Sequence, residues 1–193
     1  FIISGRRTYI DVLTKPFIPD TSNFAGTGYY FYDLNAKANY TISDKDRVFV
    51  SGYFGRDVFT FKGQGDNGTS FRIPWGNTTV SARWNHVFGP KLFLNTTATF
   101  SDYTFQFAAQ QDQFRFKLYS GIKDYGLKLD FGHYPSARHR LKYGAQYTYH
   151  IYTTSTVDVA SGDVDFDIDT PPKLHAHESA IYVLDEYDIT DAL

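Results

Sequence analysis

Residues 29–42 constrain the fold most strongly, because apolar and polar side chains alternate along them. The even positions, from Tyr30 to Ile42, are all apolar or aromatic, and the odd positions from Asp33 to Thr41 are all polar. Successive side chains of a β-strand point to opposite surfaces of its sheet. The segment therefore predicts a strand that separates an apolar environment from a wet one.

The spacing of two aromatic residues makes this environment more specific. Tyr30 and Tyr40 lie ten residues apart on the apolar side. At about 3.3 Å per residue and a tilt of about 40°, they would lie about 25 Å apart along the membrane normal. This is the height of the apolar band between the aromatic girdles of an outer-membrane barrel. We interpret residues 29–42 as a transmembrane β-strand.

The composition favours a barrel wall over other membrane structures. The 193 residues include 16 Tyr and 18 Phe, and aromatic residues make up 19% of the chain, yet the mean hydropathy is −0.38. No run of 18 apolar residues occurs, so no transmembrane helix is expected. The chain has no Cys, which excludes a disulfide framework, and its net charge of −2 gives no reason to expect a nucleic-acid partner.

Further strands are predicted from the rest of the pattern, which gives eight strands with residues 29–42 included. They cover residues 1–13, 48–62, 77–88, 92–109, 114–134, 141–152 and 175–189. The side-chain parity of the last strand stays open. In the strand at 92–109, Phe100 is in phase with Leu92, whereas Phe105 and Phe107 take the opposite parity. Residues 114–134 show a similar switch, which predicts either a β-bulge or an exit from the membrane.

The connections differ in length in a way that depends on the side of the sheet. Short turns are predicted at 43–47, 89–91 and 135–140, and the longer set at 14–28, 63–76, 110–113 and 158–174. Outer-membrane barrels have short periplasmic turns and longer extracellular loops. The predicted fold is therefore all-β, an up-and-down antiparallel meander of about eight strands that forms part of a transmembrane β-barrel. The longer set is expected on the extracellular side.

The ends of the chain lead to one further expectation. Phe1 lies within a strand pattern, the chain has no initiating Met, and the residues after Thr190 resemble the start of a turn. We expect an internal piece of a longer protein, in which 1–193 is a partial barrel domain and the first and last strands do not pair with each other.

Strand parity assigns two sets of side chains. The lipid-facing set is Tyr30, Leu34, Ala36, Ala38, Ala82, Trp84, Leu127, Leu129, Tyr143, Ala145 and Tyr147. The lumen-facing set is Asp33, Asn35, Lys37, Arg83, Lys128, Asp130, Lys142 and Gln146. The charged members of the second set could define a ligand path, but charges in a barrel lumen normally pair with one another or with a plug, and this structural role is favoured.

Several stretches resemble the middle barrel strands of TonB-dependent outer-membrane receptors, particularly the branch with an N-terminal carboxypeptidase-regulatory-like domain. They are residues 1–11, Tyr32-Asp-Leu-Asn-Ala-Lys-Ala-Asn-Tyr40, residues 44–57 and Glu178-Ser-Ala-Ile-Tyr-Val-Leu-Asp-Glu-Tyr187. The resemblance implies a transporter of about 22 strands in the outer membrane of a Gram-negative bacterium. It also implies a plug domain and a TonB box outside this chain, a TonB-type energy-coupling protein as partner, and a surface lipoprotein as a further partner.

Other residue groups have simpler explanations. The carboxylates of Asp163, Asp165, Asp167 and Asp169 could hold Ca²⁺, but no Gly occupies the calcium-loop position, and a solvated acidic loop is favoured. His175 and His177 share one face of their strand while Glu178 lies on the other, and no Ser has a Gly-flanked nucleophile setting, so neither a metal site nor an enzyme is expected. No cofactor is expected. Asn67, Asn77 and Asn95 match the glycosylation pattern by chance in a bacterial outer membrane.

Two functions are compatible with these patterns. The first is a receptor that takes up a scarce nutrient, with a plug pulled by an inner-membrane motor. The alternative is a self-contained eight-stranded outer-membrane barrel with a structural, adhesion or assembly role, which its own side chains would fill. The missing Met and the start within a strand favour the larger barrel, and the sequence does not identify the cargo.

Overall fold

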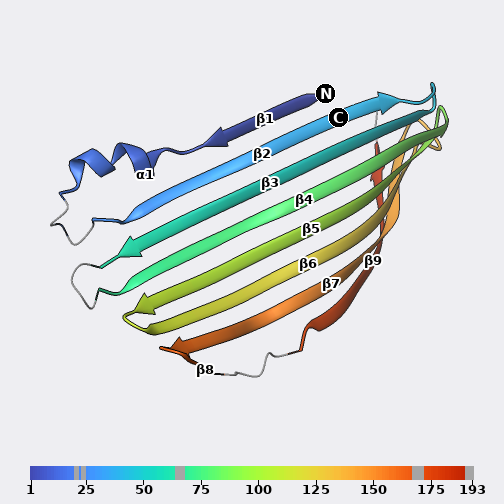
Figure 1. Ribbon diagram of the computed structural model, residues 1–193. Helices are drawn as coiled ribbons and strands as arrows, with labels where there is room; N and C mark the ends of the chain where they lie inside the picture. The colour runs from blue at the N-terminus through green and yellow to red at the C-terminus, as the bar shows by residue number, and fades with distance from the viewer. Residues whose placement is uncertain (20–21, 23–24, 64–67, 167–171, 190–193) are drawn as a thin grey trace.

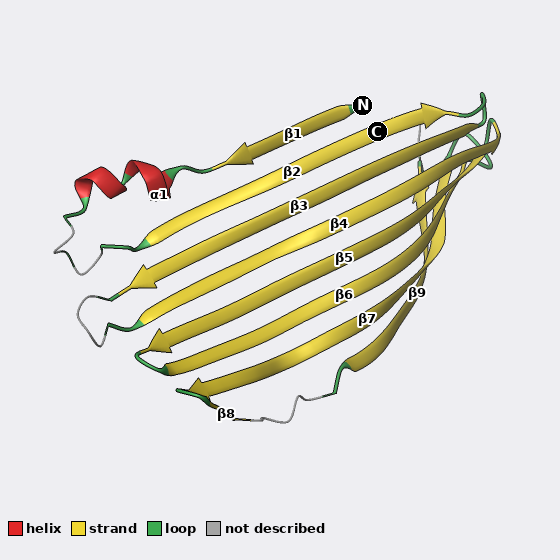
Figure 2. Ribbon diagram, in the orientation of Figure 1, coloured by secondary structure: helices red, strands yellow, loops and turns green. Residues whose placement is uncertain are grey.

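A single antiparallel β-sheet makes up nearly all of the computed structural model, which describes residues 1–19, 22, 25–63, 68–166 and 172–189 (Figures 1 and 2). The strands are β1 (Ile2–Arg7), β2 (Gly28–Thr41), β3 (Asp46–Lys62), β4 (Ser70–Gly89), β5 (Leu92–Gln111), β6 (Phe114–His133), β7 (His139–Ser161), β8 (Val164–Phe166) and β9 (Leu174–Tyr187). A short helix α1 (Ile10–Leu13) and a 3₁₀ turn η1 (Lys15–Phe17) lie between β1 and β2.

Each strand pairs with its neighbour in the chain. The order is β1-β2-β3-β4-β5-β6-β7, and β9 then pairs with β7, while the short β8 pairs with the last residues of β7. Within the described residues, β1 contacts no strand except β2, and β9 contacts no strand except β7. The predicted meander and the predicted lack of pairing between its first and last strands are both confirmed.

The strands are longer than a membrane crossing requires. β4, β5 and β6 have 20 residues each and β7 has 23, whereas about 9–11 residues are enough to cross a bilayer as a tilted strand. The prediction ended the seventh strand at residue 152, but β7 continues to Ser161. Each of these strands is therefore about twice as long as a membrane crossing would need.

Pro74 explains one wrong boundary. Residues 63–76 were predicted as a loop, but β4 begins at Ser70 and passes through Pro74. Proline has no N–H to donate, so it is expected outside central strands. Here Pro74 keeps its register opposite Val58 on β3, while the β4–β5 ladder has no pair between Arg72 and Trp75. The lost donor therefore faces β5, where the ladder is interrupted.

Three further predictions need correction. The strand at 1–13 ends at Arg7, after which Thr14 N–H and the Thr14 hydroxyl both donate to the carbonyl of Ile10 and close a helical turn. The 110–113 connection, placed in the longer set, is a tight turn in which Asp112 has φ of 50°. Residues 158–174, predicted as a loop, contain the end of β7 and the strand β8.

The parity switch predicted in two strands is not caused by a bulge in either strand. The β5–β6 ladder runs without a register shift from Leu92 to Gln111, so no bulge accompanies the switch there. The β6–β7 ladder has a register shift between Tyr119 and Gly121, but there Thr153 to Thr156 of β7 face Gly121 to Tyr119 of β6, so the extra residue belongs to β7 and β6 keeps its own alternation. Along β5 the two surfaces of the sheet therefore exchange polarity while the pairing continues.

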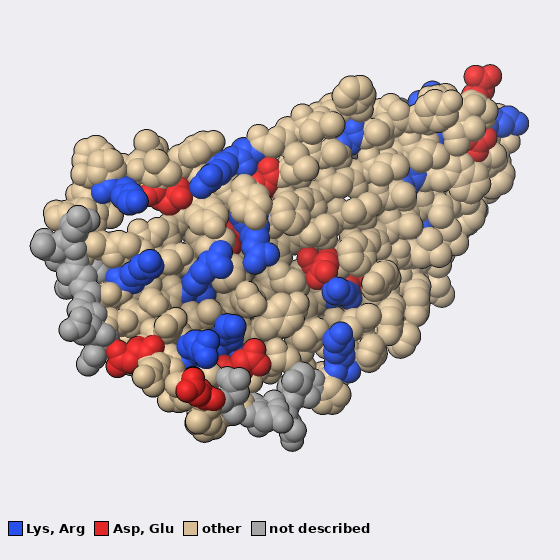
Figure 3. Space-filling view, viewed as in Figure 1, with Lys and Arg blue, Asp and Glu red and all other residues tan. Residues whose placement is uncertain are grey.

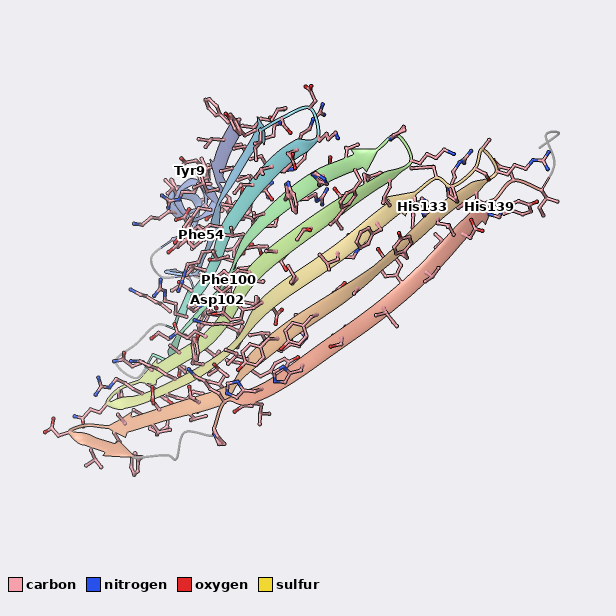
Figure 4. All side chains as sticks on the ribbon, turned by 90° about the vertical axis from the view of Figure 1, so that its right-hand side faces the viewer. Tyr9, Phe54, Phe100, Asp102, His133 and His139 are labelled. Atoms are coloured by element: carbon pink, nitrogen blue, oxygen red, sulfur yellow. The ribbon has the colours of Figure 1, made fainter. Side chains whose placement is uncertain are left out.

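The sheet is curved, and neither surface is covered by another layer (Figure 4). Its convex side faces the viewer in Figure 1, and Phe54, Phe100 and Asp102 belong to that side in Figure 4. The only buried hydrophobic residues within the described chain are Val58 and Ala160. The described part of the sheet therefore has no hydrophobic core of its own, and each of its surfaces faces solvent, lipid or another part of a protein. The side chains on each surface indicate which of these it contacts.

Candidate functional site

The register divides the predicted side chains cleanly between the two surfaces. Asp33, Asn35, Lys37, Arg83, Lys128, Asp130, Lys142 and Gln146 all lie on the concave surface. Tyr30, Leu34, Ala36, Ala38, Ala82, Trp84, Leu127, Leu129, Tyr143, Ala145 and Tyr147 all lie on the convex surface. Which surface contacts lipid and which contacts water stays a prediction.

A continuous apolar belt occupies the half of the convex surface near the short turns. Its members are Leu34, Ala36, Ala38, Val50, Phe54, Val80, Ala82, Trp84, Ala98, Phe100, Leu127, Leu129, Ala145, Tyr147, Ile181 and Val183. Large side chains in it are open, with Leu34 exposed to 50% and Ile181 to 87%. Soluble monomers rarely expose an apolar patch that extends over so many strands.

Aromatic rings border the apolar belt on both sides. On the side toward the strand ends near α1 and β8, Tyr32 contacts Phe54 with ring centroids 5.9 Å apart, and Phe100 contacts Tyr125 at 5.2 Å. We call these rings the upper girdle. Toward the short turns, rings of Trp84, His86, Phe131, Tyr143, His139 and Tyr187 make contacts of the same kind. Two bands of this type are the arrangement of the aromatic girdles at membrane interfaces.

Beyond the upper girdle the convex surface becomes charged. The ion pair between Lys123 and Asp102, with 3.2 Å between Nζ and Oδ2, lies one step past Phe100 and Tyr125 in the ladder. Figure 3 shows this surface, where charged side chains of both signs gather in the half toward α1 and β8, and fewer appear between this half and the opposite strand ends. The convex surface thus changes from apolar to charged along the strands from β3 to β7.

The concave surface opposite the belt is polar and hydrogen-bonded. Ser51 and Ser81 hydroxyls lie 2.8 Å apart, Asn85 donates to Asn95 at 3.0 Å, and Ser101 donates to Asn77 at 3.1 Å. These bonds run between strands along one continuous surface. A wall of this kind is stable against water, because its polar groups keep partners in either the sheet or the solvent.

Several predicted lumen residues are paired on this surface. Asp33 is buried and accepts a hydrogen bond from Arg6 at 2.5 Å, and Lys142 pairs with Glu186 at 2.9 Å. Asp130 pairs with Lys128 at 2.9 Å and also accepts a hydrogen bond from Tyr182. These pairs agree with the structural role favoured for the lumen charges.

Two predicted lumen residues have no such partner. Lys37 and Arg83 line one hollow of about 420 Å³ together with Ser51 and Ser81. Neither cation forms an ion pair with any residue in the described part of the chain. This hollow is the part of the predicted ligand path that the sheet leaves open.

The largest feature that the sequence prediction missed is an aromatic cluster on the concave surface, near the strand ends on the side of α1 and β8. Phe71 stacks on Phe61 with centroids 4.9 Å apart, and it also contacts Phe59 at 5.9 Å and Phe107 at 6.2 Å. Phe107 in turn contacts Phe116 at 6.1 Å. The parity switch in the sequence was a sign that aromatic residues change surface here. It could not reveal the cluster, because its rings come from four strands and meet only through the pairing register.

A second pair of rings extends this aromatic surface toward β2. Tyr29 stacks on Trp75 with centroids 6.2 Å apart, and its hydroxyl donates to Asp57 at 2.6 Å. Tyr29 and Asp57 thus place a polar pair at the edge of an otherwise apolar surface.

The remaining candidate groups lie on different surfaces of the sheet or partly outside the described residues. His175 and His177 lie on the convex surface against the hydroxyls of Tyr149 and Tyr147, at 2.6 and 2.7 Å, while Glu178 lies on the concave surface. No cluster of potential metal ligands occurs among the residues that the structure describes. Asp167 and Asp169 of the acidic run and Asn67 lie outside the described residues, and Asn77 and Asn95 form hydrogen bonds within the concave wall. No helix in the described ranges is long and apolar enough to cross a membrane.

Comparison with known proteins supports the fold. No protein-family model matches this chain, and no curated protein matches it by sequence. Among solved structures, the chain is similar to the ferric yersiniabactin uptake receptor FyuA from Yersinia pestis, with a TM-score of 0.57 and 10% sequence identity. The match covers 86% of this chain and 28% of that receptor. The predicted fold class, an antiparallel segment of an outer-membrane-type β-barrel, is confirmed.

Proposed function

We propose that this chain forms part of the barrel wall of a TonB-dependent receptor, which takes up a scarce nutrient across the outer membrane. The observation that carries the proposal is the division of one long-stranded sheet into an apolar, girdled convex surface and a hydrogen-bonded polar concave surface. The similarity in fold to a ferric yersiniabactin uptake receptor supports the same conclusion. In this receptor the convex belt contacts lipid and the predicted lumen residues line the interior.

The free edges of the sheet argue for a larger barrel. β1 and β9 do not pair with each other within the described residues, and each would leave a row of unpaired backbone groups at membrane depth. Each such group costs several kcal/mol in lipid, so further strands must cover both edges. We therefore favour a barrel of about 22 strands around a plug over the self-contained eight-stranded alternative.

The concave aromatic cluster would lie above the membrane in this barrel, on the wall that incoming cargo passes. Aromatic faces bind the apolar or planar parts of small molecules, and a few polar groups fix their orientation. Tyr29 and the adjacent Asp57 offer such polar groups at the edge of the cluster. We assign cargo contact to this surface, with an apolar or planar portion of the cargo against Phe71 and Phe107.

Uptake measurements in living cells test the function. Cells with the gene deleted, or with the energy-coupling protein deleted, should each lose high-affinity uptake of one compound in a panel that includes ferric chelates and oligosaccharides. The double variant Phe71→Ala/Phe107→Ala should raise the apparent dissociation constant at least about tenfold, since each ring contributes about 1 kcal/mol or more of contact.

A matched control separates cargo contact from folding. Phe54→Ala/Phe100→Ala removes the same atoms from the convex surface, so it should lower the amount of folded protein without changing cargo affinity. Uptake that persists without the energy-coupling protein would contradict the transporter. Equal affinity loss in both double variants would contradict the assignment of cargo contact to the concave cluster.

A further inference from the structure

A cationic hollow lies on the convex surface, above the upper girdle and opposite the aromatic cluster. It has a volume of about 240 Å³, and Lys62, Arg72, Arg115 and Lys117 line it around Ala108. Its lining includes Ser70 and Gln110 but no carboxylate. The hollow belongs to the outside of the proposed barrel, so neither cargo passage nor the interior explains it.

The register places the four cations close together. Arg72 and Lys117 lie opposite each other across Ala108, in one row of the ladder, two strands apart. Neighbouring strands are about 4.8 Å apart, so these two side chains start about 10 Å from each other and can converge on one group. Lys62 and Arg115 come from the next row, at Ser70 and Gln110.

No ion pair within the described residues neutralises these cations, although Asp158 lies next to Lys117 across the β6–β7 ladder. All four side chains are exposed, and none forms an ion pair with a residue in the described ranges. By contrast, Lys123 on the same surface is paired with Asp102. Four like charges around one hollow repel one another, and an external anion would relieve that repulsion. Arg and Lys side chains bind phosphate through strong charge-assisted hydrogen bonds.

The height of the hollow indicates the kind of anion. Val80, Phe100 and Tyr125 form the row of the ladder at which the apolar belt ends. Arg72 lies eight residues from Val80 along β4, and Lys117 lies eight residues from Tyr125 along β6. Eight residues at about 3.3 Å each and a tilt of about 40° give about 20 Å along the membrane normal. The headgroup layer of a phospholipid bilayer adds only about 5–8 Å on each side of its hydrocarbon core. A simple phospholipid therefore ends well below the hollow.

We propose that this hollow, the outer cationic site, binds phosphate groups carried on the sugar headgroup of a glycolipid in the surrounding outer leaflet. Such a lipid inserts its acyl chains against the apolar belt, and its phosphorylated sugars extend up the wall to Arg72 and Lys117. The site tethers the barrel to the lipid around it and is separate from the cargo surface on the other side of the sheet.

Lipid retention in the purified protein tests this assignment. The protein, extracted from outer membranes in mild detergent, is incubated with lipopolysaccharide that has phosphorylated core sugars, and with the same material after enzymatic dephosphorylation. We expect at least tenfold tighter retention of the phosphorylated form, falling as salt rises because the contact is exposed. Vesicles of phosphatidylglycerol and inorganic phosphate serve as the two other anionic probes.

Two variants and one control locate the site. Arg72→Gln/Lys117→Gln should weaken retention at least about tenfold, whereas Arg47→Gln/Lys45→Gln, with the same charge change at the opposite strand ends, should leave it unchanged. Ala108→Glu places a carboxylate among the four cations, so it should fold as well as the parent and still abolish retention. The folded fraction is followed by resistance to denaturation in detergent.

Each contrary result overturns the assignment. Equal retention of the dephosphorylated lipid would exclude phosphate recognition, and equal loss in the control pair would exclude this position. Inorganic phosphate or phosphatidylglycerol binding as tightly as the glycolipid would replace the proposed ligand by a free anion or a simple lipid. Cargo uptake is measured in parallel, so a failure of the outer cationic site is distinguishable from a failure of the transport function.

Discussion

Replacing Ala36 with Arg tests whether the convex belt contacts lipid. Ala36 faces the convex side between Ile3 on β1 and Gly52 on β3. On β2 it lies six residues from Tyr30 and four from Tyr40. With a rise along the normal of about 2.5 Å per residue, the two rings are about 15 and about 10 Å away, so Ala36 is near the middle of the apolar band.

The expected cost follows from this depth. An Arg on the lipid surface near the midplane costs about 2–4 kcal/mol, and the cost falls to about 0–1 kcal/mol near the interfaces. Since each 1.4 kcal/mol is tenfold, Ala36→Arg should lower the ratio of folded to unfolded protein by about 30- to 900-fold. In water, the same substitution on a half-exposed strand would change stability by no more than about 0.5 kcal/mol.

The neighbouring residue provides the control. Asn35 faces the concave side and donates to Asp33 at 3.4 Å, so Asn35→Arg adds a cation beside a buried carboxylate on the polar surface. Its cost should stay below about 1 kcal/mol. The assay is urea unfolding of the protein in phospholipid vesicles, followed by tryptophan fluorescence. Equal costs for the two variants, or a larger cost for Asn35→Arg, would refute the assignment of the two surfaces.

Three further predictions concern topology, backbone approach and pH. A cysteine at Ser161 should react with an impermeant reagent applied to intact cells and one at Lys45 should not, and the opposite result would invert the sheet in the membrane. Gly76→Ala should cost about 1–3 kcal/mol by urea unfolding, because its Cβ would lie 2.5 Å from the carbonyl oxygen of Gly55, whereas Gly52→Ala meets nothing within 4 Å and should be neutral. Hydrogen bonds from His86 and Ser43 lower the pKa of Asp46 below its ordinary value, so the stabilisation of the 43–46 turn is present above about pH 4 and is lost as the pH falls through the lowered pKa. The Val87 amide, which donates to the carbonyl of Lys45 across this turn, should lose protection from hydrogen exchange, measured relative to its intrinsic rate at each pH, as the parent is acidified, and Asp46→Asn should show no such pH-dependent loss of protection.

The sequence predicted the strands whose two faces differ in polarity. The prediction at 29–42 became β2 at Gly28–Thr41, and 92–109 became β5 at Leu92–Gln111. Alternation is local information, so a single strand reveals it. The connectivity was also accessible, because tight turns such as Gly89-Pro-Lys91 force consecutive strands to pair.

Features that depend on register could not be predicted. Phe71 and Phe107 are 36 residues apart in the chain, and nothing in either segment indicates that their rings meet. The cations of the outer cationic site come from three different strands for the same reason. Pro74 shows a second reason why strand boundaries could not be predicted. A proline is tolerated within a strand where the neighbouring strand needs no N–H donor from it, and this depends on the β4–β5 ladder.

The exchange of polarity between the two surfaces links these observations. At Phe100 and Asp102, two residues apart on β5, the convex surface changes from apolar to charged, and a few residues farther along the same strand the concave surface changes from Ser101 to Phe105 and Phe107. A water-soluble sandwich keeps one face apolar along the whole strand, because its core lies on one side throughout. The exchange is expected of a barrel wall that extends above the membrane. There its outer surface no longer contacts lipid, and its inner surface contacts a different apolar partner. In the proposed receptor, the apolar matter above the membrane is cargo, so the cluster around Phe71 should exchange between wet and covered states with each transport cycle while the outer belt stays covered by lipid.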